Sequence, residues 1–295
     1  MPLSLKSRRR RLAVAAVLVA PLVLILTVAW AAGTSLSAPA RRSVGALPAD
    51  LRGRVVEFES ASGARIRGWL LPGGRGAGTV VLMHGVRGSR LNMLGRARFL
   101  SAAGYTVLLF DFQAHGESEG SRITTGYLES RDARAAVDFV RAGAPGERVG
   151  VLGVSMGGAA ALLAEPPLDV DALVLEMVYP TIEQAIDDRL RMSVGAWGVV
   201  FRPLLTSQLR LRLGISADDL HPIDHAPKVT APKLFVAGAE DGHTTLAESR
   251  QLFDAASGPK EFWVIDGARH QDLHALKGRE YEERVLAFLD KHLRR

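Results

Sequence analysis

The sequence predicts an α/β protein: a mostly parallel, eight-stranded sheet flanked by helices, with a helical cap insertion and an N-terminal transmembrane helix. Three observations support this fold class. From residue 54 onward, short apolar runs of strand length alternate with segments of helix length, as in sheets covered on both faces. The alternation lapses between Met177 and Thr230. Near the N-terminus, Leu12–Ala32 forms an apolar run without a charge.

Composition excludes several classes of protein. The chain has 295 residues and no cysteine, which excludes disulfides, cysteine-ligated metal sites and a cysteine nucleophile. Its net charge of +6 comes from the N-terminal segment, because residues 1–54 hold nine of the 37 cations and a single acid, Asp50. Residues 55–295 therefore carry a balance of −2. A mildly acidic body argues against a nucleic-acid partner.

The N-terminal run has the length and flanks of a transmembrane signal anchor. Lys6 and four consecutive arginines precede it, and 21 helical residues span about 30 Å. Trp30 lies where aromatic residues collect at a membrane interface. We expect a basic cytoplasmic N-terminus over residues 1–11, the anchor over residues 12–33 and a membrane partner for this helix.

Other interpretations of this segment stay open. A cleaved signal peptide would have a shorter apolar core, although Ala29–Ala31 offers a cleavage site. A twin-arginine export signal and a buried helix of a soluble domain fit less well. The excess of cations before the anchor places the main domain outside the cytoplasm, either anchored by a single pass or secreted or periplasmic after cleavage. Residues 34–53 are rich in Ser, Ala, Pro and Gly, and predict a linker.

The main domain is expected over residues 54–295, with eight strands and five helices around a cap at about residues 178–229. The predicted strands are Val55–Glu59, Arg65–Leu71, Thr79–Met83, Thr106–Phe110, Val149–Val154, Ala172–Leu175, Lys233–Ala237 and Glu261–Ile265. The predicted helices are Leu91–Ala103, Tyr127–Ala142, Met156–Ala164, Thr245–Ala256 and Tyr281–Leu293.

A candidate nucleophile lies in the sequence Gly153-Val154-Ser155-Met156-Gly157, which matches G-x-S-x-G. The motif directly follows a predicted strand and directly precedes a predicted helix, as a nucleophile elbow requires. Its glycines allow a close backbone approach at a sharp turn. Ser155 is therefore the predicted nucleophile.

A serine nucleophile needs a general base and an acid, and the order in enzymes with this motif is Ser, acid, His. Asp241 follows the strand at Lys233–Ala237 and is the predicted acid, with Glu240 and Glu176 as alternatives. His270 follows the last strand and is the predicted base, with His274 as the competing residue.

Two backbone N–H groups are needed to stabilise the oxyanion. We expect them from Met156, which follows the nucleophile, and from Val86 in the loop after the strand at Thr79–Met83. His84 in the same loop is expected to shape it rather than to react. The polar turn at residues 111–118 is expected to order neighbouring loops.

These motifs together carry a family resemblance. LMHG, DFQAHGES, GVSMGG, GAED and DGARH occur in the order and spacing of the α/β-hydrolase superfamily. The chain resembles in particular its serine-aminopeptidase-like, Bem46-like and dienelactone-hydrolase-like branch, over residues 55–295. One departure is Gln113, where many relatives carry arginine. The resemblance implies a Ser155/Asp241/His270 triad, no cofactor and no metal.

The predicted function is a serine hydrolase that cleaves an ester, or secondarily an amide, of a small-molecule substrate through an acyl-enzyme. Ser155 excludes superfamily members with an aspartate nucleophile, and no H-E-x-x-H metal motif occurs. The alternative is a non-catalytic binding or scaffold protein on the same fold. In the cap, Trp197 and Phe201 belong to an apolar set that either packs on the domain below or forms an acyl-binding or membrane-touching surface.

Overall fold

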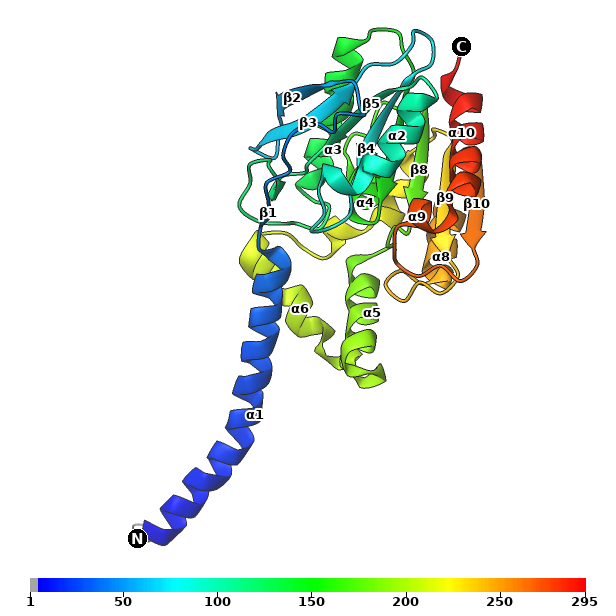
Figure 1. Cartoon of the computed structure of the whole chain (residues 1–295). Helices are drawn as coiled ribbons and strands as arrows, with labels where there is room; N and C mark the ends of the chain where they lie inside the picture. The colour runs from blue at the N-terminus through cyan, green and yellow to red at the C-terminus, as the bar shows by residue number, and fades with distance from the viewer. Residues whose placement is uncertain (1–4) are drawn as a thin grey trace.

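An eight-stranded sheet forms the centre of the computed structural model, which describes the backbone of residues 5–295 and the side chains of residues 19–295 (Figure 1). The strand order is β10-β9-β8-β7-β4-β5-β3-β2. In chain order the strands are β2 (Arg54–Glu59), β3 (Arg65–Leu71), β4 (Thr79–Met83), β5 (Thr106–Phe110), β7 (Val149–Val154), β8 (Ala172–Glu176), β9 (Lys233–Gly238) and β10 (Lys260–Ile265).

The sheet is mixed, with one antiparallel edge. β3 pairs antiparallel with both β2 and β5, whereas the remaining neighbours pair parallel. The prediction of a mostly parallel sheet is thereby confirmed. β4 lies between β5 and β7, so the next parallel strands of the chain are added on opposite sides of β4. Such a switch point leaves a crevice at the carboxyl ends of the strands, where ligands bind.

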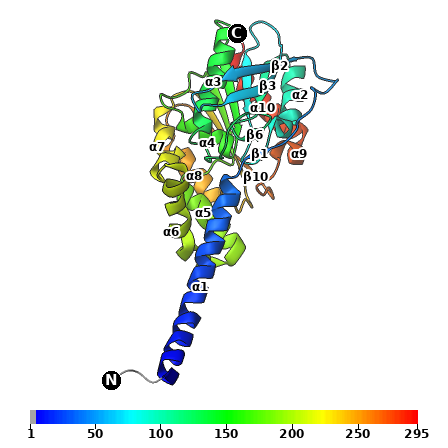
Figure 2. The same ribbon diagram turned by 90° about the vertical axis from the view of Figure 1, so that its left-hand side faces the viewer.

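Helices cover both faces of the sheet, as Figure 2 shows. One face carries α3 (Glu129–Gly143), α4 (Met156–Leu163) and α8 (Leu246–Ala255), whose apolar residues share one core with the sheet. The other face carries α2 (Leu94–Ala102) and α10 (Arg279–Leu293), which build a second core. The short helix α9 (Leu273–Lys277) precedes α10.

The helix predicted over Leu91–Ala103 is an α-helix only from Leu94 onward. A 3-10 turn at Arg90–Met93 precedes α2. The Asn92 side chain caps this turn, because its Oδ1 accepts from the Ser89 N–H over 2.9 Å, while the Asn92 N–H donates to the Ser89 carbonyl as the turn's own 3-10 bond. A side-chain cap of this kind satisfies a backbone donor at the start of the helix.

The cap lies between β8 and β9. It contains α5 (Ile182–Val194), a 3-10 turn (Ala196–Phe201), α6 (Arg202–Gln208) and a π-helical turn (Leu209–Leu213). Shorter pieces return the chain to the sheet: the 3-10 turns Asp218–Leu220 and Ala226–Lys228, and α7 (Pro222–His225). α5 and α6 extend away from the sheet beside the N-terminal helix (Figure 1).

The N-terminal helix α1 (Leu5–Ser37) projects from the same end of the molecule (Figure 1). Its stretch Val19–Ser37 has a mean hydropathy of 1.9 and is not buried in the domain, so it is long and apolar enough to cross a membrane. Of the predicted basic N-terminus, residues 1–4 lie outside the described part of the chain.

The predicted linker at residues 34–53 is not a free tether, because parts of it form regular structure and contact the domain. Helix α1 continues to Ser37, and β1 (Ala40–Arg41) pairs parallel with β6 (His115–Gly116). The Arg42 guanidinium donates to the Arg87 carbonyl over 2.6 Å. The composition of this segment is that of a linker, but its backbone finds partners in loops that are distant in sequence. The start of the domain is thus joined to the loops around the sheet's carboxyl edge.

Candidate active site

Ser155 lies at the sharp turn between β7 and α4. Its backbone has φ 50° and ψ −116°, an unusual conformation for a residue with a side chain. The Ser155 N–H donates to the Glu176 carbonyl over 2.8 Å, which holds the turn against β8. A Cβ on Gly153 would lie 2.6 Å from Gly158 Cα, and one on Gly157 would collide with the Met83 carbonyl. Small residues are therefore required around the serine.

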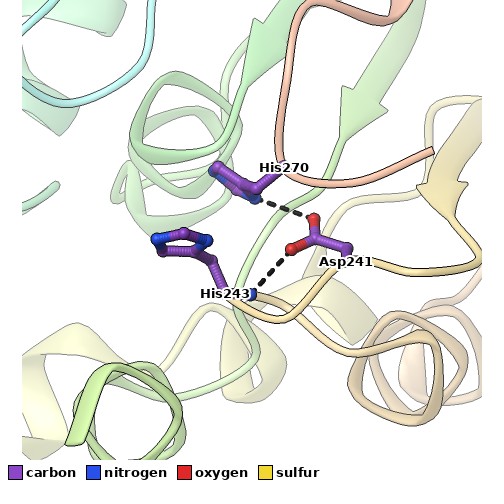
Figure 3. A group of neighbouring side chains, drawn as sticks. All are labelled: Asp241, His243 and His270. Atoms are coloured by element: carbon purple, nitrogen blue, oxygen red, sulfur yellow. Dashed lines mark hydrogen bonds and ion pairs between the residues drawn. The ribbon is translucent and has the colours of Figure 1, made fainter. Parts of the chain in front are cut away.

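The side chains of Ser155, His270 and Asp241 form one hydrogen-bonded chain. His270 Nε2 lies 3.2 Å from Ser155 Oγ. His270 Nδ1 lies 2.7 Å from Asp241 Oδ2, and the Asp241 side chain is fully buried (Figure 3). Ser155 follows β7, Asp241 follows β9 and His270 follows β10, so the carboxyl ends of three strands of the sheet supply the three groups. The imidazole can accept a proton from the serine while the carboxylate holds its other N–H.

The second oxygen of Asp241 has partners of its own. Asp241 Oδ1 accepts from the N–H groups of His243 at 2.8 Å and Thr244 at 3.0 Å. These two bonds fix the carboxylate orientation, so that Oδ2 remains directed at His270. A carboxylate held in this way orients the imidazole and stabilises it when it becomes protonated.

The alternative acids lie in other environments. Glu176 is fully buried, and its Oε2 accepts from Arg96 over 2.7 Å. Tyr281 Oη also donates to the Glu176 carboxylate. Glu240 is exposed to solvent and lies 3.8 Å from Arg269. The structure therefore brings Asp241, and neither glutamate, to His270.

The competing histidine points elsewhere. His274, in α9, lies 2.8 Å from Glu282 Oε1 and stacks near the Phe99 ring. Because Glu282 belongs to α10 and Phe99 to α2, His274 packs with the helices on that face of the sheet. His270 is the histidine that reaches Ser155.

The two predicted oxyanion donors flank Ser155. Val86 follows β4, and Met156 is the first residue of α4. Both line the same small pocket as Ser155. A helix N-terminus leaves its first N–H groups free of helical partners, which suits the Met156 N–H to a developing negative charge.

His84 shapes the loop that carries Val86. Its Nδ1–H donates to the Gly85 carbonyl over 2.8 Å, and its Nε2 accepts from the Phe112 N–H over 3.1 Å. Full burial lowers the pKa of His84 to about 3, so this imidazole stays neutral and keeps that pattern of bonds. Next in the loop, the Arg87 N–H donates to His115 Nε2 over 3.0 Å.

Two residues of the site had no signal in the sequence. The His243 ring lies against His270, with centroids 5.0 Å apart (Figure 3), and burial lowers the pKa of His243. Arg189 reaches the site from α5 of the cap, and burial lowers the pKa of its guanidinium as well. In the sequence alone, a histidine after Asp241 and an arginine in a cap helix have the pattern of surface residues. Only the tertiary fold brings them to the site.

A cleft of about 410 Å³ opens above Ser155. Its walls carry the guanidinium groups of Arg87, Arg96 and Arg189, together with His243 and His270. Asp272, which lies 2.9 Å from Arg96, is the one carboxylate among the lining residues in the described part of the chain. Because Arg96 is also paired with Glu176, its charge is balanced, and Arg87 and Arg189 supply the positive charge of the cleft.

Two clusters of side chains have the ligand types of a metal site. Asp241, His243 and His270 place one ligand atom each within 4.8 Å of one another. Both Asp241 oxygens and His270 Nδ1 are already engaged in mutual or backbone hydrogen bonds, so a metal there would have to break them. The second cluster, Glu183, Asp218 and His221, is on the cap surface, with His221 Nε2 bonded to Glu183 at 2.8 Å.

Comparisons with known proteins identify relatives of this chain. The family model described as serine aminopeptidase, S33, matches residues 74–194. An uncharacterized Mycobacterium tuberculosis protein is 31% identical over 259 residues, which cover 85% of this chain and 83% of the relative. The Arabidopsis thaliana alpha/beta hydrolase domain-containing protein WAV2 is 26% identical over 251 residues, with 80% and 78% covered.

Solved structures show the same fold. The Pyrococcus furiosus esterase Pf2001 superposes with a TM-score of 0.73 at 24% identity, covering 88% of this chain and 98% of the esterase. An esterase from Exiguobacterium antarcticum superposes with a TM-score of 0.59 at 19% identity, covering 80% and 100%.

Proposed function

This chain belongs to the α/β-hydrolase superfamily, and within it we propose that the protein is a serine hydrolase of carboxylic esters. The observation that carries the proposal is the hydrogen-bonded chain from Ser155 through His270 to Asp241. A buried carboxylate, an imidazole and a hydroxyl in this order activate a serine that is otherwise a weak nucleophile.

The reaction has two balanced halves. Ser155 Oγ attacks the ester carbonyl carbon while His270 Nε2 takes the hydroxyl proton. The bond from the carbonyl carbon to the alcohol oxygen then breaks, and His270 returns the proton to the departing alcohol. Water repeats the sequence on the acyl-enzyme, which releases the carboxylic acid and free Ser155. The backbone N–H groups of Val86 and Met156 stabilise the oxyanion in both halves.

Cleavage of an amide is the secondary possibility, because the matching family model is described as a serine aminopeptidase. An aminopeptidase needs an anion for the substrate's free ammonium group. The only lining carboxylate in the described part of the cleft, Asp272, is paired with Arg96. The guanidinium-bearing residues Arg87 and Arg189, which also line the cleft, oppose a cationic substrate. The charge of the site therefore favours an ester.

We also propose that residues 12–33 of α1 anchor the protein in a membrane by a single pass, with the catalytic domain outside the cytoplasm. The apolar length and the cations before it support this orientation. Because the chain has no cysteine, Ser4→Cys and Ala142→Cys variants each give one thiol, and Ala142 is exposed near the end of α3. In intact cells, a membrane-impermeant maleimide should label only the Ala142→Cys variant. A labelled soluble fragment lacking α1 would instead indicate signal cleavage.

Labelling with a fluorophosphonate tests the catalytic proposal. The full chain should react, Ser155→Ala should not, and Ser193→Ala, an exposed cap serine, should react like the unchanged protein. Hydrolysis of p-nitrophenyl esters should exceed that of amino-acid arylamides. If the folded protein neither labels nor hydrolyses any ester, the non-catalytic binding role is the correct one.

A further inference from the structure

An apolar groove leads from Ser155 to the end of the N-terminal helix. Its inner part is lined by Val86, Ser155 and Met156, and its outer part by Leu205, Leu209 and Leu213. The two parts adjoin because they share four lining residues, Leu36, Thr125, Ile182 and Ile186. We call this the apolar groove.

Its walls come from segments that are far apart in sequence. Leu36 belongs to α1, Ile182 and Ile186 to α5, and Leu209 to the π-helical turn after α6. Aliphatic side chains dominate both parts, although Arg189 lines the inner part and Arg212 the outer part. The cleft above Ser155 adjoins the inner part, because the two share Ser155 and Arg189. A substrate that fits the groove has a hydrocarbon chain on one side of its ester bond.

The outer end of the groove is where α1 meets the cap. The Gln208 side chain donates to the Ala29 carbonyl over 2.9 Å. The Arg212 guanidinium donates to the Trp30 carbonyl over 2.5 Å. A Cβ on Gly33 would collide with Gln208, so glycine allows the two helices to approach. These contacts fall on Val19–Ser37, the stretch of α1 that can cross a membrane.

The cap also presents apolar side chains to the outside at this end of the molecule. Met192, Val194, Trp197, Val200 and Leu211 are exposed, and Trp197 retains 83% of its accessible surface. α5 and α6 lie beside α1 in Figure 1, and Figure 2 shows α6 next to α1 from the side. Exposed apolar side chains beside a membrane helix are expected to enter the bilayer interface, where burying them is favourable.

We propose that the apolar groove binds the long acyl chain of a membrane lipid, which enters between α1 and the cap and places its ester carbonyl at Ser155. This inference rests on the proposed ester hydrolysis and adds the substrate class. Helix α1 is then both the anchor and a wall of the substrate site, through Leu36. The acyl chain reaches the serine without crossing water.

Two substitutions at different depths test the groove. Ile186→Trp fills the part that adjoins the serine, and Leu209→Trp fills only the outer part. The full chain in phosphatidylcholine vesicles is assayed with p-nitrophenyl esters of two to sixteen acyl carbons. We expect kcat/KM of the unchanged protein to rise with acyl length. Ile186→Trp should lower the ratio of twelve-carbon to two-carbon kcat/KM by about tenfold or more, because several methylenes lose their site.

The depth of the substitution should set the acyl length at which activity falls. Leu209→Trp should leave esters of medium length unaffected and lower kcat/KM only for longer ones. Val55→Trp adds the same ring at an exposed position on β2, and should keep the length profile of the unchanged protein.

The outcomes separate the two proposals. A flat length profile, or a profile that Ile186→Trp leaves unchanged, together with normal fluorophosphonate labelling, would overturn the groove while the hydrolase stands. Absence of labelling and of hydrolysis at every length would overturn the hydrolase itself.

Discussion

The Arg212 guanidinium lies over the Trp30 indole, 3.7 Å from the ring centroid, and joins the cap to the N-terminal helix. The same guanidinium donates to the Trp30 carbonyl over 2.5 Å and to Gln208 Oε1 over 2.8 Å, and its positive charge faces the aromatic ring. This contact holds the end of α1 beside the outer part of the apolar groove. The position of the proposed membrane helix is thereby coupled to the shape of the proposed catalytic pocket.

Gly33→Leu should separate α1 from the cap, because even a Cβ at this position meets Gln208. We expect limited trypsin digestion to cut the cap arginines several times faster, and the ratio of long-chain to short-chain kcat/KM to fall. Mass spectrometry of the fragments locates the cuts. Thr34→Leu, at an exposed neighbouring position, is the matched control. Equal digestion of the two variants would contradict the docking of α1 on the cap.

Asp241→Asn should lower kcat for ester hydrolysis by about 10⁴-fold, because an amide cannot hold the imidazole in the same tautomer. Glu240→Gln changes the neighbouring, exposed carboxylate and should alter kcat less than twofold. Combining Asp241→Asn with Ser155→Ala should cost little more than Ser155→Ala alone, since the residues act as a unit. A large loss from Glu240→Gln would assign the acid differently.

Glu176→Gln should affect stability rather than chemistry. The substitution leaves the buried Arg96 charge with only the half-exposed Asp272 as a carboxylate partner, and breaking a buried pair costs about 3–5 kcal/mol. We expect a lower free energy of unfolding in denaturant titrations, with kcat of the remaining folded protein within a few fold. Glu282→Gln removes a partly exposed carboxylate near the same helices and should cost much less. Loss of kcat without loss of stability would indicate that Glu176 takes part in the reaction.

The protonated Glu248 carboxyl should contribute folding stability that is lost as the pH rises from about 4.5 to about 8, whereas the buried, neutral His84 contributes stability that is gained as the pH rises to about 6.5. Burial, and then the neighbouring Asp188 carboxyl of the cap, raise the pKa of Glu248 to about 7. The buried Arg189 guanidinium also lies near both acids. A raised carboxyl pKa means that the folded state binds the proton more tightly, so its stabilising contribution is present at low pH and lost above pH 7.

Glu248→Gln keeps a hydrogen-bond donor toward Asp188 without needing a proton. Between pH 5 and pH 8 its melting temperature should therefore fall less, or rise more, than that of the unchanged protein, which changes the slope of melting temperature against pH. Burial also raises the pKa of Asp132 to about 7, so Asp132→Asn should remove a further part of the slope. Glu280→Gln, on the exposed side of α10, should leave the slope unchanged. An unchanged slope in Glu248→Gln would mean that its carboxyl titrates normally.

Most of the sheet could be predicted from local pattern. The bounds of β3, β4, β5 and β7 agree with the predicted runs, because a buried strand needs a short continuous apolar segment bounded by turn residues. The G-x-S-x-G turn was equally local, since the close approaches at Gly153 and Gly157 are made within one strand–helix junction and its neighbour β4. The structure of the linker could not be predicted locally, because β1 forms only by pairing with His115–Gly116, which is distant in sequence.

The sequence by itself determined the strands, the serine turn, the membrane-length helix and the order of candidate acid and base. It left Asp241, Glu240 and Glu176 as possible acids, because a carboxylate after a strand has the same local signature whatever its neighbour. Only the tertiary structure decided between them, by engaging Glu176 with Arg96 and Tyr281 and turning Asp241 toward His270. It likewise brought Leu36 to Ser155, since contacts between distant segments depend on packing and not on local pattern.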